Sequence, residues 1–212
     1  MGKSTENNIY GNIGVGLYDV PSSPYDTVLY YNPLKSNAII LGASMSGKTV
    51  MLKNILARMN ENEPYRSIER TYILDFGGNI GRYSELGRVC ACFDNSNGEN
   101  VKRIFMAVEN ELNSNSRALS GKNYLTYLND HPDSPIPHIT LIIENVTAFF
   151  AEERYENYHR LLTKFARDGL SKGVSIILTA NDFTGMLSKL SVYFSRKFAL
   201  VLFPWCPVVI TI

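Results

Sequence analysis

Eight consecutive residues have the types and the spacing of a phosphate-binding loop. They match the pattern G-x-x-x-x-G-K-[ST] at every fixed position, and they are Gly42, Ala43, Ser44, Met45, Ser46, Gly47, Lys48 and Thr49. In such a loop the backbone N–H groups point inward toward a phosphate, and the start of the next helix adds its positive dipole end. The octapeptide therefore predicts a site for the phosphates of a nucleotide.

Three residues of this loop have separate expected roles. Gly47 lets the backbone approach a phosphate closely, Lys48 is expected to reach the β- and γ-phosphates, and the Thr49 hydroxyl is expected to ligate Mg²⁺. The alternative is a glycine-rich turn with an exposed lysine. The setting between a predicted strand at 37–42 and a predicted helix at 47–60 favours the phosphate site.

A second set of candidate residues ends the most continuous apolar run of the chain, 138–145. Nucleotide hydrolysis needs a carboxylate near the metal ion and a group that positions or deprotonates water, and the usual pair at the end of such a strand is Asp-Glu. Here the pair is Glu144-Asn145. Glu144 keeps the negative charge on a side chain one methylene longer than Asp. We therefore expect Thr49 and Glu144 to hold Mg²⁺.

Asn145 stands where a carboxylate base is usual. A carboxamide does not take up a proton at neutral pH, and such a base contributes ~10²–10⁴ in rate, so we expect weak or absent hydrolysis. Asn145 also fits a residue that caps the turn after the strand, and the two roles are compatible. Asp75 and Asp182 end other predicted strands and could compensate, although Asp at such places more often caps a loop.

Composition limits the classes of protein to which the chain can belong. Its 212 residues carry 21 Lys and Arg against 20 Asp and Glu, a net charge of +1, which argues against nucleic acid as a partner. Hydrophobic residues make up 45% and charged residues 19%, less charge than the usual ~25%, so we expect one folded domain with a sizeable core. No apolar run approaches the ~18 residues of a membrane span, and any anchor of the parent protein is expected outside this segment.

The cysteines and histidines do not have the spacing of a metal site. Cys90, Cys92 and Cys206 are an odd number, and we expect buried thiols in a reducing compartment. Cys90 and Cys92 are two residues apart, which in a regular strand places both on one face. The three histidines are scattered, so the sequence does not indicate zinc.

The remaining pattern predicts the elements that position the candidate residues. Strands are expected at 27–31, 37–42, 70–76, 89–93, 138–145, 174–180 and 196–203. Helices are expected at 47–60, 99–119, 154–170 and 184–190, with a short helical piece and a loop within 120–137. This alternation, with several strands apolar throughout, is typical of a three-layered α/β fold with a parallel sheet. Ligands of such sheets bind beyond the carboxyl ends of the strands. The residues expected there are Gly42, Phe76, Asn145 and Asn181.

The order of these segments resembles the FtsK/SpoIIIE-type ATPases. The shared features are the phosphate loop, the segment 74–78, the strand 141–145 and the helix-then-strand passage 161–182. The turn Asp75-Phe76-Gly77-Gly78 and the opening segment 13–21 are similar to the tandem ATPase modules of type VII secretion coupling proteins, the EssC/EccC family. The resemblance covers roughly residues 12–203. Residues 1–11 are expected to be a flexible segment, and the apolar tail 204–212 has no match in the family.

This resemblance implies a RecA-like P-loop fold, ATP and Mg²⁺ as ligands, and a polar sensor role for Asn181. It implies a membrane-anchored protein with several such modules on the cytoplasmic face of the bacterial cell membrane. Implied partners are neighbouring modules of the same polypeptide and secreted WXG-type helical hairpins, with a possible oligomer of the full-length protein. The degenerate pair Glu144-Asn145 looks like the C-terminal modules of that family, which are considered weak in hydrolysis.

Three functions remain open at this point, and with them the question whether the chain is an enzyme. The first is an ATP-binding module of a secretion motor with weak or absent hydrolysis. The second is a substrate-recognition or scaffold domain that no longer uses nucleotide, favoured by Asn145 and by 13 Tyr and 10 Phe. The third is an active DNA translocase of the FtsK type, which rests on kinship alone.

Overall fold

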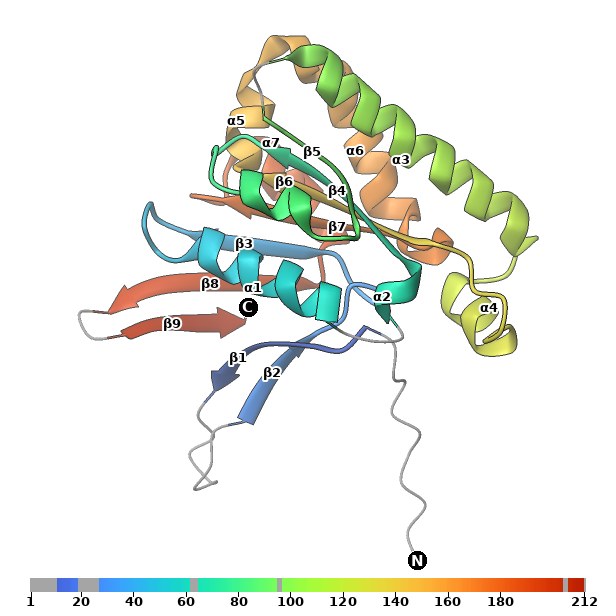
Figure 1. Ribbon diagram of the computed structural model, residues 1–212. Helices are drawn as coiled ribbons and strands as arrows, with labels where there is room; N and C mark the ends of the chain where they lie inside the picture. The colour runs from blue at the N-terminus through green and yellow to red at the C-terminus, as the bar shows by residue number, and fades with distance from the viewer. Residues whose placement is uncertain (1–10, 19–26, 62–64, 95–96, 204–205, 212) are drawn as a thin grey trace, which may run out of the picture.

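The computed structural model describes residues 11–18, 27–61, 65–94, 97–203 and 206–211. Within them the chain forms one seven-stranded sheet with helices on both faces, and a separate two-stranded sheet of β1 and β2 (Figure 1). The predicted flexible segment 1–11 lies outside the described residues except for Gly11.

Most elements follow the predicted ranges. The strands are β1 (Ile13–Tyr18), β2 (Thr27–Tyr31), β3 (Ala38–Gly42), β4 (Glu69–Asp75), β5 (Val89–Asp94), β6 (His138–Glu144), β7 (Val174–Ala180), β8 (Arg196–Phe203) and β9 (Cys206–Thr211). The helices are α1 (Lys48–Glu61), α2 (Tyr65–Ile68), α3 (Gly98–Leu119), α4 (Tyr124–Asp130), α5 (Val146–Ala151), α6 (Glu156–Asp168) and α7 (Gly185–Leu190). Single 3₁₀ turns are η1 (Gly81–Glu85), η2 (Glu153–Tyr155), η3 (Leu170–Lys172) and η4 (Ser191–Tyr193).

The large sheet has the strand order β5-β4-β6-β7-β3-β8-β9. Neighbouring strands from β5 to β8 are parallel, and β9 is antiparallel to β8. Every residue of β6 and β7 is buried, as expected for strands in the middle of a sheet that is covered on both faces. The predicted α/β class with a mostly parallel sheet is confirmed.

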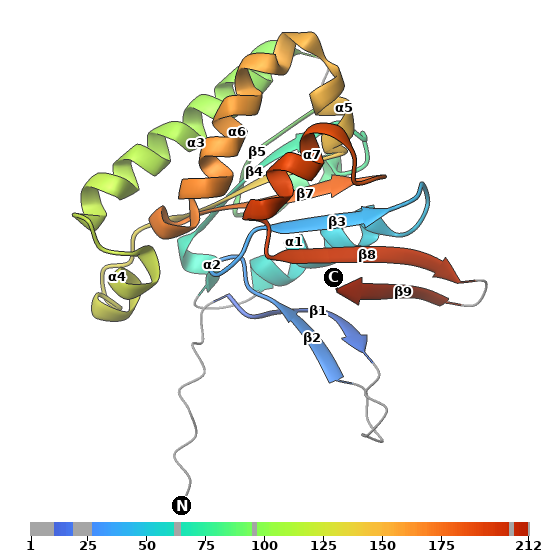
Figure 2. The ribbon, with the colours of Figure 1, turned by 180° about the vertical axis from the view of Figure 1, so that it is seen from behind.

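Two apolar clusters fill the space on the two sides of the sheet. One joins the sheet to α3, α5, α6 and α7, which lie together on the face seen in Figure 2. The other joins the opposite face to α1, α4 and the β1–β2 sheet. Helix α3 shows why the periodicity could be read from the sequence. Its predicted apolar stripe is fully buried, and the Asn97 side chain caps its start by accepting the N–H of Glu99. The stripe consists of Val101, Ile104, Phe105, Val108 and Leu112.

Several elements of the structure were not expected from the sequence, among them β1, β9 and α5. Strand β1 contains Gly14 and Gly16, which weaken a strand pattern, yet it pairs with β2 around a register shift between these glycines. The predicted apolar tail 204–212 contains β9, which pairs with β8 from Cys206 to Thr211. Helix α5 is only six residues long and follows β6 after one residue, too short for a helical period to be visible.

The expected burial of the cysteines on one face is wrong. Cys90 is exposed and Cys92 is partly buried. The ladder between β4 and β5 shifts register between Thr71 and Tyr72, and such a bulge interrupts the alternation of side chains. Cys92 accordingly packs against the α1-side cluster, where burial raises the pKa of its thiol to about 11. The side chain of Cys206 lies outside what the structure describes.

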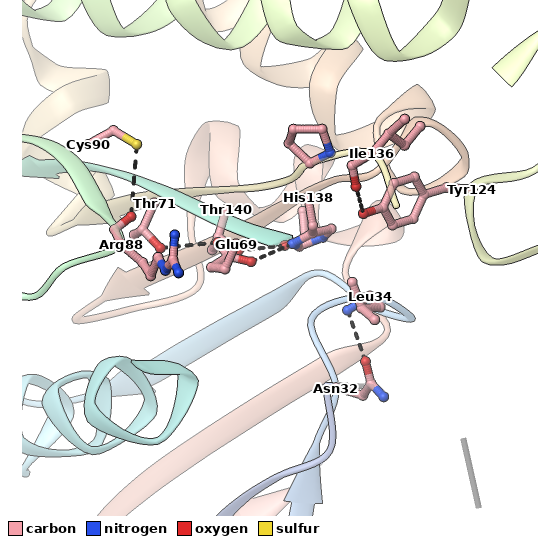
Figure 3. Close-up of polar contacts among 12 residues, drawn as sticks. Asn32, Leu34, Glu69, Thr71, Arg88, Cys90, Tyr124, Ile136, His138 and Thr140 are labelled. Atoms are coloured by element: carbon pink, nitrogen blue, oxygen red, sulfur yellow. Dashed lines mark hydrogen bonds and ion pairs between the residues drawn. The ribbon is translucent and has the colours of Figure 1, made fainter. Parts of the chain in front are cut away.

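A buried polar pair lies at the amino-terminal ends of two central strands. Glu69 begins β4 and His138 begins β6, the two residues are paired in register, and His138 Nδ1 lies 2.7 Å from Glu69 Oε2 (Figure 3). Glu69 Oε1 also accepts a hydrogen bond from the Thr71 hydroxyl at 3.1 Å. Both side chains of the pair are 1% exposed. Because these strands are parallel, the pair lies at the sheet edge opposite to the carboxyl ends.

Candidate functional site

The predicted phosphate loop connects the central strand β3 to the start of α1. Its first glycine is required by packing, because a Cβ at Gly42 would overlap the Ser46 hydroxyl and lie 2.8 Å from the carbonyl oxygen of Leu200 on β8. Gly47 has a φ of +99° and nothing within 4 Å of a Cβ position. A glycine here is therefore explained by the backbone conformation and not by crowding.

Lys48 folds back over the loop. Its Nζ donates hydrogen bonds to the carbonyl oxygens of Gly42 at 2.7 Å and Ala43 at 2.8 Å. Partial burial lowers the pKa of Lys48, and the nearby charge of Glu144 acts in the opposite direction. The loop thus holds a positive charge where the sequence predicts contact with phosphates.

Thr49 and Glu144, the two predicted metal ligands, are brought together by the sheet. Strand β7 lies between β3 and β6, and the side chains still meet, because the Thr49 hydroxyl donates to Glu144 Oε1 at 3.4 Å. Glu144 is only 4% exposed. The pKa of Glu144 is raised, first by burial and then by the charge of Asp75, while the Thr49 hydrogen bond, the charge of Lys48 and the backbone N–H of Gly77 oppose the shift.

The residues present fit a magnesium ion. Glu144 Oε2 is buried and has no hydrogen-bonding partner among the described residues, so one carboxylate oxygen is available to a cation. Carboxylate and hydroxyl oxygens are ligands that Mg²⁺ accepts, and this ion usually takes its other ligands from water and substrate phosphates. Accordingly, the described residues contain no group of three or more His, Cys, Asp or Glu that would form an all-protein metal site.

Asn145 does not cap the turn in the way expected. Its backbone is left-handed, with φ of +57°, a conformation that Asn tolerates better than most residues. Its N–H donates to the Thr179 hydroxyl on β7 at 2.8 Å, and its carbonyl oxygen accepts the N–H of Ala148 at 3.0 Å. The side chain makes no capping hydrogen bond to α5. The first N–H groups of α5 therefore donate to the backbone carbonyl of Asn145, and the expected side-chain cap is not formed.

The two compensating carboxylates are both engaged in local turns. Asp75 accepts the N–H groups of Asn79 at 3.2 Å and Ile80 at 2.7 Å. Asp182 accepts the Thr184 hydroxyl at 2.8 Å and is exposed. The loop-capping alternative that the sequence favoured for both therefore agrees with the structure.

Asn181, the predicted sensor residue, directly follows β7, the strand between β3 and β6. Its side chain is exposed. In the described part of the chain its amide makes no hydrogen bond to Glu144 or to the loop. The structure thus places Asn181 at the expected edge without joining it to the other site residues.

Sequence reasoning assigned no role in the site to Gly77. A Cβ at this position would overlap Glu144 Oε2 and lie 2.5 Å from Cδ and 2.7 Å from Oε1 of the same side chain. Gly77 therefore packs directly on the carboxylate. The available signal was the pair Gly77-Gly78 immediately after a predicted strand, which indicates a close approach or a turn.

A groove of ≈ 740 Å³ lies elsewhere, between β1–β2 and α1, and none of the loop residues 42–49 lines it. We take the loop and not this groove as the candidate site, because the phosphate-loop pattern, the Lys48 ammonium and the buried Glu144 carboxylate occur together at the loop. In the described part of the chain, no helix is both long and apolar enough to cross a bilayer.

Comparisons with known proteins place this geometry in context. No family model matches the chain. The type VII secretion system protein EssC of Staphylococcus aureus strain MRSA252 is 25% identical over 194 residues, which cover 89% of this chain and 13% of that protein. The EssC protein of strain NCTC 8325 is 22% identical over 195 residues with the same coverage. The chain thus spans 13% of the length of these curated relatives.

Solved structures of similar fold include two type VII ATPase proteins. The protein EssC (ATPases 2 and 3) from Geobacillus thermodenitrificans has a TM-score of 0.80 and 20% identity over 90% of this chain and 37% of that one. Thermomonospora curvata EccC (ATPases 2 and 3), solved in complex with a signal sequence peptide, has a TM-score of 0.81 and 18% identity over 93% and 37%. The conjugation coupling protein TcpA has a TM-score of 0.66 and 15% identity over 92% and 55%.

The strand order and the structural likeness give the chain a RecA-like P-loop fold. Similarity to EssC in sequence covers most of the chain, and the loop at 42–49 lies between β3 and α1, as that fold requires. The chain is thus similar in sequence to the type VII secretion system protein EssC, and it shares its fold with the ATPase domains of EssC and EccC.

Proposed function

We propose that the chain is the nucleotide-binding module of a type VII secretion ATPase, that it binds Mg²⁺-ATP at residues 42–49, and that it hydrolyses ATP weakly or not at all. The observation that carries the proposal is the hydrogen bond between Thr49 and Glu144 directly beside Asn145. It unites a complete phosphate loop and a metal carboxylate with a residue that is unable to act as a base.

Binding follows from the loop and its immediate neighbours. We expect backbone N–H groups of the loop to donate to a phosphate chain, the first turn of α1 to add its dipole, and Lys48 to supply a positive charge. Thr49 and Glu144 would hold Mg²⁺, which neutralises charge on the β- and γ-phosphates. The unpartnered Oε2 of Glu144 supports this assignment.

Weak hydrolysis follows from a carboxamide, Asn145, at the position where a carboxylate base is usual. The Asn145 carboxamide can orient water by hydrogen bonding, but it does not take the proton. Asp75 and Asp182 are engaged in local turns. Nucleotide occupancy would then act mainly by stabilising one conformation of the module over another.

The wider biology is proposed from the relatives. Neighbouring ATPase modules of the same polypeptide are expected partners, because the chain covers only 13% of the EssC relatives. The T. curvata EccC structure contains a signal sequence peptide, and we propose secreted WXG-type proteins as substrates of the parent protein. The module would then face the cytoplasm from a membrane-anchored protein that oligomerises at full length.

The alternative of a scaffold that no longer uses nucleotide keeps only one of its two supports. Asn145 remains compatible with it. The aromatic surplus does not favour it, because the largest fully buried side chains include many of these aromatic residues. Those residues are Tyr31, Tyr124, Tyr155, Phe105, Phe149, Phe165, Phe194 and Phe198. No observation supports the third function, a DNA translocase, and the net charge of +1 opposes it.

Calorimetric titration with Mg²⁺-ATP, run beside a phosphate-release assay, tests the proposal. We expect saturable binding that weakens when EDTA removes Mg²⁺, with turnover far below the usual ~1–100 s⁻¹ of phosphoryl-transfer enzymes. Absence of binding would favour the scaffold. Turnover within that range would overturn the claim of weak hydrolysis while leaving the claim of binding intact.

A further inference from the structure

We propose that Gly77 is a positioning residue that allows Glu144, instead of the usual shorter Asp, to serve as the metal carboxylate. The proposal deepens the proposed function and rests on it for the role of the metal ion. Its structural basis is the packing of the turn after β4 against the end of β6.

The atoms nearest to a side chain at position 77 belong to the Glu144 carboxylate. The three nearest atoms to a Cβ at position 77 are Oε2, Cδ and Oε1 of Glu144, at 2.5 Å for Cδ and 2.7 Å for Oε1. Gly77 is not among the glycines with positive φ, so alanine would meet no backbone strain there. The obstacle to a side chain at position 77 is thus the Glu144 carboxylate itself.

The turn that carries Gly77 is anchored and has little freedom to move away. Asp75 accepts the N–H groups of Asn79 and Ile80 across the turn. The Asn79 side chain donates to the Gly77 carbonyl oxygen at 2.8 Å. Phe76 N–H donates to the backbone oxygen of Glu144 at 3.1 Å, which extends the β4–β6 ladder to the turn itself.

The position of Gly77 accounts for the extra methylene of Glu144. The side chain is held at one oxygen by Thr49, at 3.4 Å from Oε1, and its other oxygen lies against Gly77. A side chain on residue 77 would force the buried carboxylate away from Thr49. With Asp at 144 the carboxylate is drawn back by one methylene, and the need for glycine at 77 disappears.

A stability cycle without nucleotide tests the packing. The variants are Gly77→Ala, Glu144→Asp and the double variant, with Gly81→Ala as a control. Gly81 is suitable because a Cβ at this position has nothing within 4 Å and this glycine has no positive φ. We expect the urea midpoint of Gly77→Ala to fall clearly below that of Gly81→Ala. In the double variant the midpoint should return to that of Glu144→Asp.

A second measurement tests the link to the metal ion. ATP binding is titrated at a series of Mg²⁺ concentrations and in EDTA. We expect Gly77→Ala to need about 10–100-fold more Mg²⁺ for half of the full Mg²⁺-dependent gain in ATP affinity, the usual cost of disturbing residues behind a metal ligand. In EDTA its affinity for ATP should stay within twofold of that of wild type. The double variant should match Glu144→Asp.

Each outcome decides the proposal. If Gly77→Ala equals Gly81→Ala in both measurements, or if the double variant is as impaired as Gly77→Ala, the glycine does not position Glu144. If Gly77→Ala fails to fold, recovery in the double variant supports the proposal and failure to recover overturns it. If the wild-type chain binds no ATP, the proposed function fails, and the stability cycle alone decides the packing of Gly77 on Glu144.

Discussion

Asp75 and Glu144 occupy matching positions on the parallel strands β4 and β6, so two carboxylates end neighbouring strands at one edge of the sheet. Their partners differ. Asp75 accepts two backbone N–H groups of its own turn, whereas Glu144 has the Thr49 hydroxyl on one oxygen and none on the other among the described residues. Because of this asymmetry, Glu144 is the carboxylate that is available to a cation.

Glu144 should destabilise the fold when it is ionised and Mg²⁺ is absent. Burial and then the charge of Asp75 raise the pKa of Glu144 above its ordinary value of 4.5. Between 4.5 and this raised value the native state holds more protons than the unfolded state, so stability falls as pH rises through that window. We expect Glu144→Gln not to show this fall in stability. Measured by urea unfolding, the free energy of unfolding of the variant should therefore rise relative to that of wild type between pH 4 and neutrality.

A matched control for this prediction is Glu153→Gln, since Glu153 is exposed. Its stability should keep a constant offset from wild type over the same pH range. If Glu144→Gln also kept a constant offset, the buried carboxylate would not be the source of the pH dependence.

Lys48 should contribute most of the cationic part of nucleotide binding. Hydrogen bonds to charged groups are worth about 1.5–3 kcal/mol, so Lys48→Ala should weaken ATP binding by about 10–100-fold. The control is Lys53→Ala, which removes a lysine of α1 whose ammonium lies 5.6 Å over the Tyr83 ring. Calorimetry should find nearly wild-type affinity for the control, and equal losses in the two variants would place the nucleotide elsewhere.

The strand–loop–helix arrangement at 38–61 could be predicted because the residues of the loop are consecutive and their pattern is local. The pairing of Thr49 with Glu144 was also predictable, since parallel strands bring their carboxyl ends to one edge. Gly77 was not, because its role depends on the register of β4 against β6, which pairs residues 69 positions apart in the sequence, such as Asp75 and Glu144.

Other differences have the same origin in non-local contacts. Strand β9 was missed because its only described pairing in the sheet is with β8, and an apolar tail does not reveal such a partner. The cysteines were misplaced because the register shift in β5 is a property of the pairing with β4. Isolated periodicity does not report a bulge.

The pair of Glu69 and His138 should stabilise the fold without taking part in binding. It is buried where β4 and β6 begin, at the sheet edge opposite to their carboxyl ends. Removing one partner of a buried pair typically costs about 3–5 kcal/mol, so Glu69→Ala should lower the free energy of unfolding by that order in urea titrations. At a temperature where the variant remains folded, ATP affinity should equal that of wild type.

Thr71→Val serves as the control for that variant, because it removes only the hydroxyl that donates to Glu69 Oε1. Its cost should be near the ~1 kcal/mol of a single hydrogen bond. A loss in Glu69→Ala no larger than this would mean that the contact with His138 adds little to stability. A loss of ATP affinity in the folded variant would show that the two edges of the sheet are coupled.

Replacing the carboxamide of Asn145 by a carboxylate should increase the rate of ATP hydrolysis. Asn145→Glu recreates a carboxylate at the position where a base is usual, and a base contributes ~10²–10⁴ in rate, so phosphate release should rise by about that factor while ATP affinity changes little. The left-handed backbone at 145 makes Glu less favourable there by roughly 1 kcal/mol, which a urea titration measures separately.

Asn145→Gln has the same length and the same backbone cost without the charge, and it should stay as slow as wild type. If Asn145→Glu binds ATP and still turns over no faster than Asn145→Gln, the missing base is not what limits hydrolysis, and the limit must lie in groups that this module does not supply on its own.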